Sequence, residues 1–277
     1  MAFSVGVLVY DILHTLVGNR GRATTKILML GYPAKHMRHP VFRPLFDLLA
    51  KQGHKPEICN NDEFVVKSVE AADIVILKTY HHDPRVIAKA REFEAAGKRV
   101  INSTLAIYAV ADRVRTDEML EAACLPVPPR VVTKNKTNRV LPPYVQKPRN
   151  NFLHKISFVQ NVADLCFDVG FYYQQLVPND GIDRKLYVIG TQVFLITRPS
   201  THVQNFERKL REKRMCLSPP EQWRAWATKI GELTGLEVYG VDLVGQDDAF
   251  YIIDVNPFPG FMGVVDAPIL LARLILQ

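Results

Sequence analysis

Short apolar runs alternate with amphipathic stretches in the first part of the chain. Runs with the length and β-branched composition of buried strands occur at residues 25–31, 55–59, 72–78 and 99–102. Between them, a helical period is clearest at about residues 40–52, just before Gly53, and at about 84–96. Strands that alternate with helices are typical of a parallel sheet, so this pattern predicts a small parallel α/β domain.

Hairpin signals replace this alternation in the last third of the chain. Apolar runs joined by short polar turns, which are expected to pair as antiparallel strands, occur at residues 185–190 with 192–198 and at residues 240–244 with 251–255. Helices are expected at about 221–234 and 267–276. The sequence therefore predicts a mixed protein, α/β at its start and α+β towards its end.

The order of these elements divides the chain into three parts. Residues 1–24 are expected to be an N-terminal extension, because their apolar stretch contains Asp11 and His14, lacks a basic start and is too short to span a bilayer. Residues 25–101 form the predicted N-terminal α/β domain. Residues 102–277 are expected to form the α+β part.

Three oxygen-bearing side chains gather at the predicted C-terminal hairpin. Alternate residues of a strand share a face, so Asp254 and Asn256 point the same way while Val255 points opposite. Asp242 on the partner strand can reach that face. Such oxygen ligands suit magnesium, which completes its octahedron with water and phosphate. The set therefore predicts a magnesium and nucleotide site, although solvated strand residues are the alternative interpretation of these residues alone.

The constellation resembles the ATP-grasp superfamily of ATP-dependent ligases and kinases, over roughly residues 102–263. This resemblance implies that two α+β lobes, at about 125–176 and 177–277, clasp the nucleotide after the N-terminal α/β domain. It also implies one or two magnesium ions, with manganese as a substitute, held against ATP by Asp242, Asp254 and Asn256.

Two further matches assign contacts to the ATP phosphates by resemblance. Arg113 takes the place of a lysine that family members direct at the phosphates, and Lys147 resembles the strand lysine that contacts the α- and β-phosphates. Many family members follow this strand with a glycine-rich loop, whereas residues 149–155 contain no glycine. His154, in this shortened loop, is a further candidate for a phosphate contact.

The following strands supply the remaining nucleotide candidates. The adenine hinge of the family, whose backbone groups read the edge of the base, is matched by Gln175, Leu176 and Val177. Asp180 is the candidate for the ribose. Lys185 and Arg198 would project toward the γ-phosphate, where cations stabilise the charge that moves during phosphoryl transfer.

Cationic side chains collect at the carboxyl ends of the predicted parallel strands, where open α/β sheets bind ligands. The region contains neither a Gly-x-Gly-x-x-Gly motif nor a Walker loop, so it is not predicted to bind a nucleotide itself. A solvated basic loop is the alternative. The residues that we consider candidates for binding an acceptor are Lys35, Arg38, His39 and Lys78.

Composition narrows the class of protein. The 277 residues are 48% hydrophobic and 23% charged, as expected for a globular protein with a substantial core. The four cysteines are far apart, so neither a disulfide framework nor a zinc site is expected, and a cytoplasmic location is favoured. The net charge of +7 is dispersed, which favours an anionic small-molecule or peptide acceptor over nucleic acid or a membrane. A homo-oligomer is left open.

Two enzyme functions and one binding function remain. We expect transfer of the γ-phosphoryl group of Mg-ATP to an acceptor, most simply by a RimK-like ligase that joins a carboxylate to an amine through an acyl phosphate. The alternative is a phosphotransferase similar to the inositol polyphosphate kinases, which stops after phosphorylating a hydroxyl group. A noncatalytic nucleotide-binding protein is the third hypothesis, and the absent glycine-rich loop is the feature that supports it.

Overall fold

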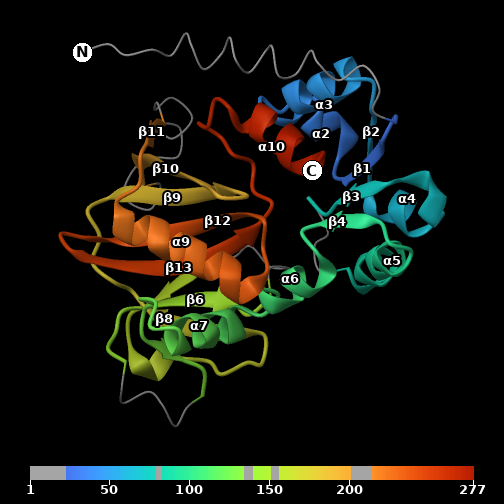
Figure 1. Cartoon of the computed structure of the whole chain (residues 1–277). Coiled ribbons are helices and arrows are strands. Elements are labelled where there is room, and N and C mark those ends of the chain that lie inside the picture. Colours follow the sequence, from blue (N-terminus) through green and yellow to red (C-terminus); the bar gives the residue numbers. More distant parts are fainter. Residues whose placement is uncertain (1–22, 79–82, 134–139, 151–155, 201–213) are drawn as a thin grey trace, which may run out of the picture.

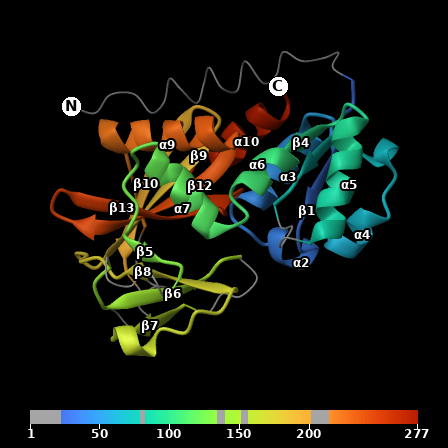
Figure 2. The same ribbon diagram turned by 90° about the horizontal axis from the view of Figure 1, so that it is seen from below.

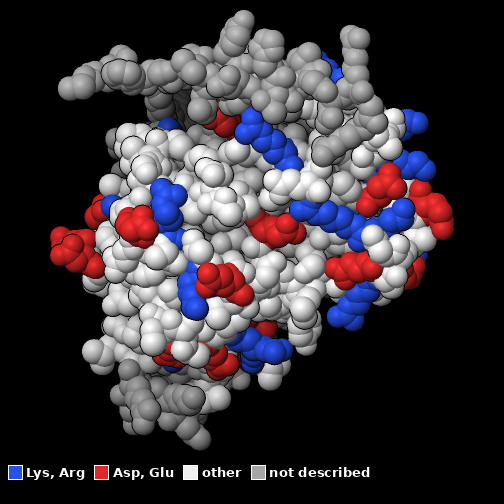
Figure 3. Space-filling view, viewed as in Figure 1, with Lys and Arg blue, Asp and Glu red and all other residues white. Residues whose placement is uncertain are grey.

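A computed structural model describes residues 23–78, 83–133, 140–150, 156–200 and 214–277 (Figure 1). Almost all of the expected N-terminal extension lies outside these ranges. None of the helices in the described ranges is both long enough and apolar enough to cross a membrane. On the face of the molecule in Figure 3, basic and acidic side chains are interspersed, and they do not gather into one basic patch.

The N-terminal domain is the predicted parallel α/β unit. Its four parallel strands lie in the order β2 (Lys55–Cys59), β1 (Lys26–Leu30), β3 (Ile74–Ile76) and β4 (Arg99–Ile101). The helices of this domain are α2 (Pro33–His36), α3 (Phe42–Lys51), α4 (Asn61–Val65) and α5 (Pro84–Ala95), with a short helical turn η1 at Val69–Ala71. Because alternate strand residues face opposite sides, β1 buries Ile27 and Met29 beneath α3 and Leu28 and Leu30 beneath α5.

Two short helices of this domain were not expected from the sequence. The stretch after β1 contains the single-turn helix α2, which Pro33 begins with a φ angle already suited to a helix. Helix α4 was not expected at all. Asn60 starts it by accepting the N–H of Glu63, whose side chain in turn accepts the N–H of Asn60.

An antiparallel sheet forms the centre of the molecule. Its strands lie in the order β11 (Met215–Leu217), β10 (Gln192–Pro199), β9 (Ile182–Ile189), β12 (Val238–Gln246) and β13 (Ala249–Pro257). Both predicted hairpins are confirmed, as β9 with β10 and β12 with β13. Helix α9 (Glu221–Thr234) lies across one face of this sheet (Figure 1).

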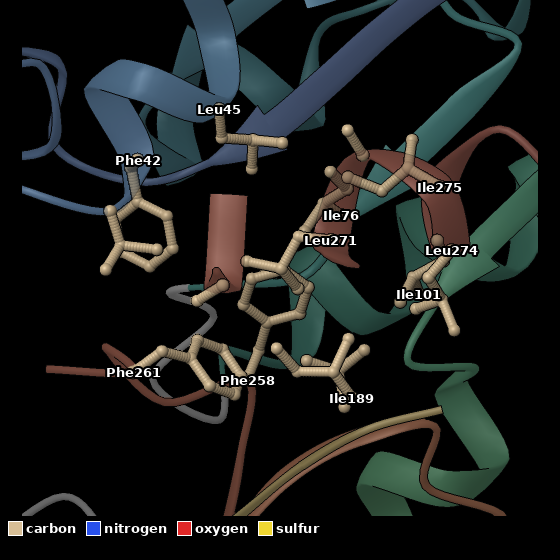
Figure 4. Packing of buried hydrophobic residues seen from close by; sticks show 14 of the residues in the cluster. Phe42, Leu45, Ile76, Ile101, Ile189, Phe258, Phe261, Leu271, Leu274 and Ile275 are labelled. Carbon is tan, nitrogen blue, oxygen red and sulfur yellow. The ribbon is translucent and has the colours of Figure 1, made fainter. Parts of the chain in front are cut away.

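The other face of the central sheet joins the N-terminal domain. The last helix, α10 (Ala267–Ile275), returns to pack beside α3, and the shared core contains Ile189, Phe258 and Leu271 (Figure 4). Asn102 fixes this junction because its buried amide donates to the carbonyl of Val238 at 2.8 Å and accepts the N–H of the same residue at 2.9 Å. The sheet is therefore fixed to the N-terminal domain.

A smaller sheet projects from this body (Figure 2). Its strands lie in the order β5 (Arg130–Val131), β8 (Phe171–Gln175), β6 (Tyr144–Pro148) and β7 (Ser157–Val159). Helices α6 (Thr104–Ala109) and α7 (Arg113–Ala122) lead into it, and a short turn η3 lies at Val162–Asp164. Ser103 caps α6, because its side chain accepts the N–H of Ala106. Asp112 caps α7, because its carboxylate accepts the N–H of Val114 at 2.9 Å.

Candidate nucleotide and metal site

A row of charged side chains crosses three neighbouring strands of the central sheet. Asp254 on β13 pairs with Asp242 on β12, and Asp242 pairs with Lys185 on β9. Residues that are directly opposite in antiparallel strands share a face, so these three side chains stand side by side. Farther along β9, the same face buries Tyr187 and Ile189 against the N-terminal domain. One face of the sheet thus changes from apolar to charged along its strands.

The two aspartates and Asn256 have the arrangement that strand alternation predicts. The side-chain amide of Asn256 donates to Asp242 Oδ2 at 3.3 Å, whereas Val255 is buried on the opposite face beneath α9. Lys185 Nζ lies 2.8 Å from Asp242 Oδ1. This ion pair is poorly aligned for a hydrogen bond, and the buried Oδ1 atom has no other donor within the described part of the chain.

These residues fit a hard divalent cation. Two carboxylates and an amide oxygen are the ligand types that magnesium prefers, and Asp242 Oδ1 is an underused acceptor. Burial raises the pKa of Asp254, but Arg113 and two lysines outweigh burial and hold it below its ordinary value, so this carboxylate is charged. No third His, Cys, Asp or Glu completes a metal-binding group in the ranges that the structure describes, which leaves positions for phosphate or water.

Two cations reach this row from the small lobe and α7. Lys147 on β6 is buried, and its Nζ donates to the carbonyl of Ile253 at 2.8 Å. Arg113, the first residue of α7, contacts both carboxylate oxygens of Asp254 at 3.3 Å and the carbonyl of Pro148 at 3.1 Å. The strand with the predicted phosphate lysine and the strand with the predicted metal ligands are therefore joined by these two cations.

A pocket beside this contact contains polar residues that the sequence did not single out. It lies between α7 and β13, and Asp117 faces it one helical turn after Arg113. Asp117 accepts the side-chain amide of Gln174 at 2.7 Å, and burial raises its pKa to about 6 despite Lys147 nearby. Gln174 is next to the predicted hinge, but its partner Asp117 is distant in sequence, so the sequence could not predict this pair. The position of Asp117 one helical turn after Arg113 was the only feature of the sequence that could have indicated its place in the site.

The hinge offers fewer free backbone donors than expected. The N–H of Gln175 donates to Pro129 and that of Leu176 donates to Pro143, both at 2.8 Å. Among the described residues, the N–H of Val177 has no such partner. Asp180, the ribose candidate, is held by Arg184 at 2.8 Å. If this segment reads adenine, Val177 therefore supplies the N–H.

The candidates for the γ-phosphate each have a carboxylate partner. Lys185 pairs with Asp242, and Arg198 Nε donates to Asp183 Oδ2 at 3.2 Å across the β9–β10 register. Asp183 and Lys185 are two residues apart on β9, so Arg198 lies beside the same charged row. His154 lies outside the described residues.

The acceptor candidates lie at the carboxyl ends of β1 and β3. Lys35 and Arg38 are exposed on and just after α2, and Lys78 Nζ lies 5.6 Å above the ring of Phe42. His39 contacts the loop that follows β13, since a side chain at Gly260 would begin only 3.2 Å from its Nε2. The structure thus places His39 next to the segment that continues from Asn256.

Comparison with known proteins identifies the family. The family model of the ATP-grasp domain matches residues 110–260, which is more than half of the chain. The chain belongs to the ATP-grasp family. ATP-grasp proteins use ATP with magnesium, in agreement with the ligand types gathered here.

Individual relatives agree with this assignment. The chain is 26% identical to the "Probable alpha-L-glutamate ligase" of Alkalilimnicola ehrlichii, over 93% of its own length and 90% of the relative's. It is similar to the RimK domain ATP-grasp protein of Sphaerobacter thermophilus, with a TM-score of 0.69 and 18% identity over 91% of this chain and 100% of that one. A structure of the ATP-grasp ligase PsnB with a phosphomimetic precursor variant, Mg and ADP is similar with a TM-score of 0.68 and 16% identity. The match covers 92% of this chain and 99% of that one. The expected ATP-grasp fold is confirmed, and the expected similarity to a RimK domain protein is found.

Proposed function

We propose that this ATP-grasp protein is a carboxylate-amine ligase that forms an amide through an acyl phosphate. The observation that carries the proposal is the row Asp254, Asp242 and Lys185, which Lys147 meets from the small lobe and Arg113 meets from α7. Two carboxylates for a metal and three cations for phosphates are the groups that phosphoryl transfer from ATP needs. The relative named as a glutamate ligase, aligned over nearly the whole chain, favours the ligase over the kinase.

The residues divide into three roles in this proposal. Asp242, Asp254 and Asn256 would hold one or two magnesium ions, or manganese, which neutralise charge on the phosphates. Lys147 and Arg113 bind the phosphates, and Val177 and Asp180 bind the base and ribose. The ion pairs of Arg113 with Asp254 and of Lys185 with Asp242 place cations for the phosphates directly beside the carboxylates for the metal.

The chemistry follows from positioning and charge. An oxygen of the acceptor carboxylate bonds to the γ-phosphorus while the bond to the β-phosphate oxygen breaks, and ADP leaves. Lys185 and Arg198 stabilise the charge that moves onto the transferring group. The nitrogen of the amine then attacks the acyl carbon, phosphate leaves, and the amine loses a proton. Neither step requires a nucleophile from the protein, and none is assigned.

Release of ADP tests this proposal. The full chain with magnesium and ATP is expected to release ADP only when a carboxylate and an amine are both present, in step with amide formation. Asp254→Asn is expected to abolish this release, because a neutral amide replaces a charged metal ligand. Asp248→Asn removes the same charge from the exposed turn of the same hairpin and is the matched control.

Two results would contradict the ligase. Release of ADP with an inositol polyphosphate alone, without an amine, would assign the kinase reaction. Binding of ATP with no acceptor-stimulated ADP, across pools of carboxylates, amines and inositol phosphates, would assign a noncatalytic role. Near-native turnover by Asp254→Asn would contradict the metal assignment.

A further inference from the structure

Two histidines near the end of β1 are arranged as hydrogen-bond donors. His36 Nδ1 accepts the N–H of Tyr32 at 2.8 Å, and His39 Nδ1 accepts the N–H of Val41 at 3.2 Å. A ring nitrogen that accepts carries no proton, so each ring is neutral and its proton is on Nε2. Burial, with Lys78 and Lys35 nearby, lowers the pKa of His36 to about 4 and also lowers the pKa of His39.

Two lysines complete what we call the donor cluster: Lys35, His36, His39 and Lys78. Lys78 is partly buried above Phe42, and no described carboxylate lies within ion-pair distance of its Nζ. Burial and the charge of Lys35 lower the pKa of Lys78 to about 8. A partly buried cation without a counter-ion is unfavourable, so this position gains stability when an anion binds.

The cluster has an apolar floor. The ring of His39 stacks on Phe42 with centroids 4.5 Å apart, and Phe42 packs against Phe258 at 6.3 Å. Figure 4 shows both phenylalanines among the apolar residues that join the N-terminal domain to the central sheet. Such a floor keeps water from one side of the lysines and strengthens their attraction for an anion.

The cluster is also close to the proposed reaction site. His39 touches Gly260, which is four residues after Asn256, so that glycine is at most about 14 Å from the metal ligand even in a fully extended chain. In Figure 2, α2 lies at the edge of the N-terminal domain on the side to which the small lobe projects. One small molecule can therefore reach from the donor cluster to the charged row.

We propose that Lys35, Lys78 and the Nε2–H group of His39 bind a carboxylate of the acceptor that is remote from the reacting one. The acceptor is then a dicarboxylate, either a free amino acid or the end of a peptide, and this inference rests on the proposed ligase function. Two cations and the neutral donor of His39 match one carboxylate. They carry less charge than a polyphosphorylated ring requires, so the cluster suits the acceptor of the ligase better than that of the kinase.

Direct binding tests the cluster without turnover. Glutarate, a dicarboxylate, and butyrate, a monocarboxylate of similar length, are compared as ligands of the full chain in the presence of magnesium and ADP by saturation-transfer NMR titration. Glutarate is expected to bind at least about tenfold more tightly, as charge-assisted hydrogen bonds require. Lys78→Gln should remove this preference. Lys55→Gln, which removes an exposed lysine from the opposite end of the same sheet, should keep it.

Turnover separates this inference from the ligase proposal. With an amine present, L-glutamate or a peptide ending in glutamate is expected to have a KM about tenfold below that of the matching glutamine compound, and Lys35→Gln, at an exposed position, should raise that KM with little change in kcat. Whichever glutamate compound has the lower KM identifies the source of the dicarboxylate. Equal affinity for glutarate and butyrate, or no effect of either lysine variant, would overturn the donor cluster while leaving amide formation intact. Loss of all carboxylate-stimulated ADP release would instead overturn the ligase.

Discussion

The two cationic regions of this protein differ in their partners. In the nucleotide site, each cation outside the small lobe has a carboxylate: Arg113 has Asp254, Lys185 has Asp242, and Arg198 has Asp183. In the donor cluster, Lys35 and Lys78 have no carboxylate among the described residues, and both histidines are neutral. In the first region the cations are paired with carboxylates of the protein, and phosphates and a metal ion can replace these partners. In the second region the anion must come from a ligand.

This difference has a physical reason. Asp242 and Asp254 must be present to hold a divalent cation, and two adjacent carboxylates repel each other unless cations balance them. Arg113 and the nearby lysines hold the pKa of Asp254 below its ordinary value, and Lys185 opposes the rise in the pKa of Asp242 that burial causes. An acceptor site has no such requirement, and a carboxylate in it would repel an anionic substrate. The pattern of ion pairs thus separates a site for a cation with phosphates from a site for an anion.

The largest expected effect concerns Lys147, whose Nζ donates to the carbonyl of Ile253 and has no carboxylate within ion-pair distance among the described residues. Lys147→Ala should weaken ATP binding by about a hundredfold, because it removes a buried positive charge that binds the phosphates and also the hydrogen bond to the carbonyl of Ile253. Isothermal titration calorimetry with ATP and magnesium measures the change. Lys55→Ala, at an exposed strand end, is the control. Unchanged affinity in Lys147→Ala would remove this lysine from the phosphate site.

Neutralising a paired lysine and neutralising an unpaired lysine should change the free energy of unfolding in opposite directions. Lys185→Met leaves Asp242 without its counter-ion and should destabilise the chain by about 1–2 kcal/mol, a value reduced from the buried case because both side chains are about a quarter exposed. Lys78→Met removes an unpaired cation from an apolar floor and should stabilise the chain by about 1 kcal/mol. Urea unfolding without ligands at neutral pH measures both, and changes of the same sign would contradict the comparison.

Strand alternation made the shared face of Asp254 and Asn256 predictable. A period of two residues places Asp254 and Asn256 on one face and Val255 on the other whatever the tertiary contacts are, so the sequence was sufficient. The same holds for the parallel N-terminal domain, whose strand and helix patterns are strong. These features depend on local geometry alone.

Other features depend on contacts that a sequence does not record. Asp112 and Thr116 are both residue types that cap helices, and only the hydrogen bond to Val114 shows which one does so. The pairing of Asp117 with Gln174 requires α7 to dock on the small sheet. That Lys78 lacks a carboxylate could not be read from its position at a strand end, because exposed and unpaired lysines have the same local sequence.

The smallest expected effect is the part of the pH dependence of stability that the unpaired Lys78 contributes, beside the buried Lys147, whose pKa is also lowered. The pKa of Lys78 is about 8 in the folded chain and 10.5 as the ordinary value, so between these pH values the unfolded chain binds a proton that the folded chain has lost. Stability should therefore rise with pH through this window, by a fraction of a kcal/mol for a partly exposed group. Lys78→Met should flatten this part of the curve, whereas Lys55→Met should leave it unchanged. Because a bound dicarboxylate stabilises the charged lysine, saturating glutarate should bring the wild-type curve to the slope of Lys78→Met, and a wild-type curve that glutarate leaves unchanged would place the anion elsewhere.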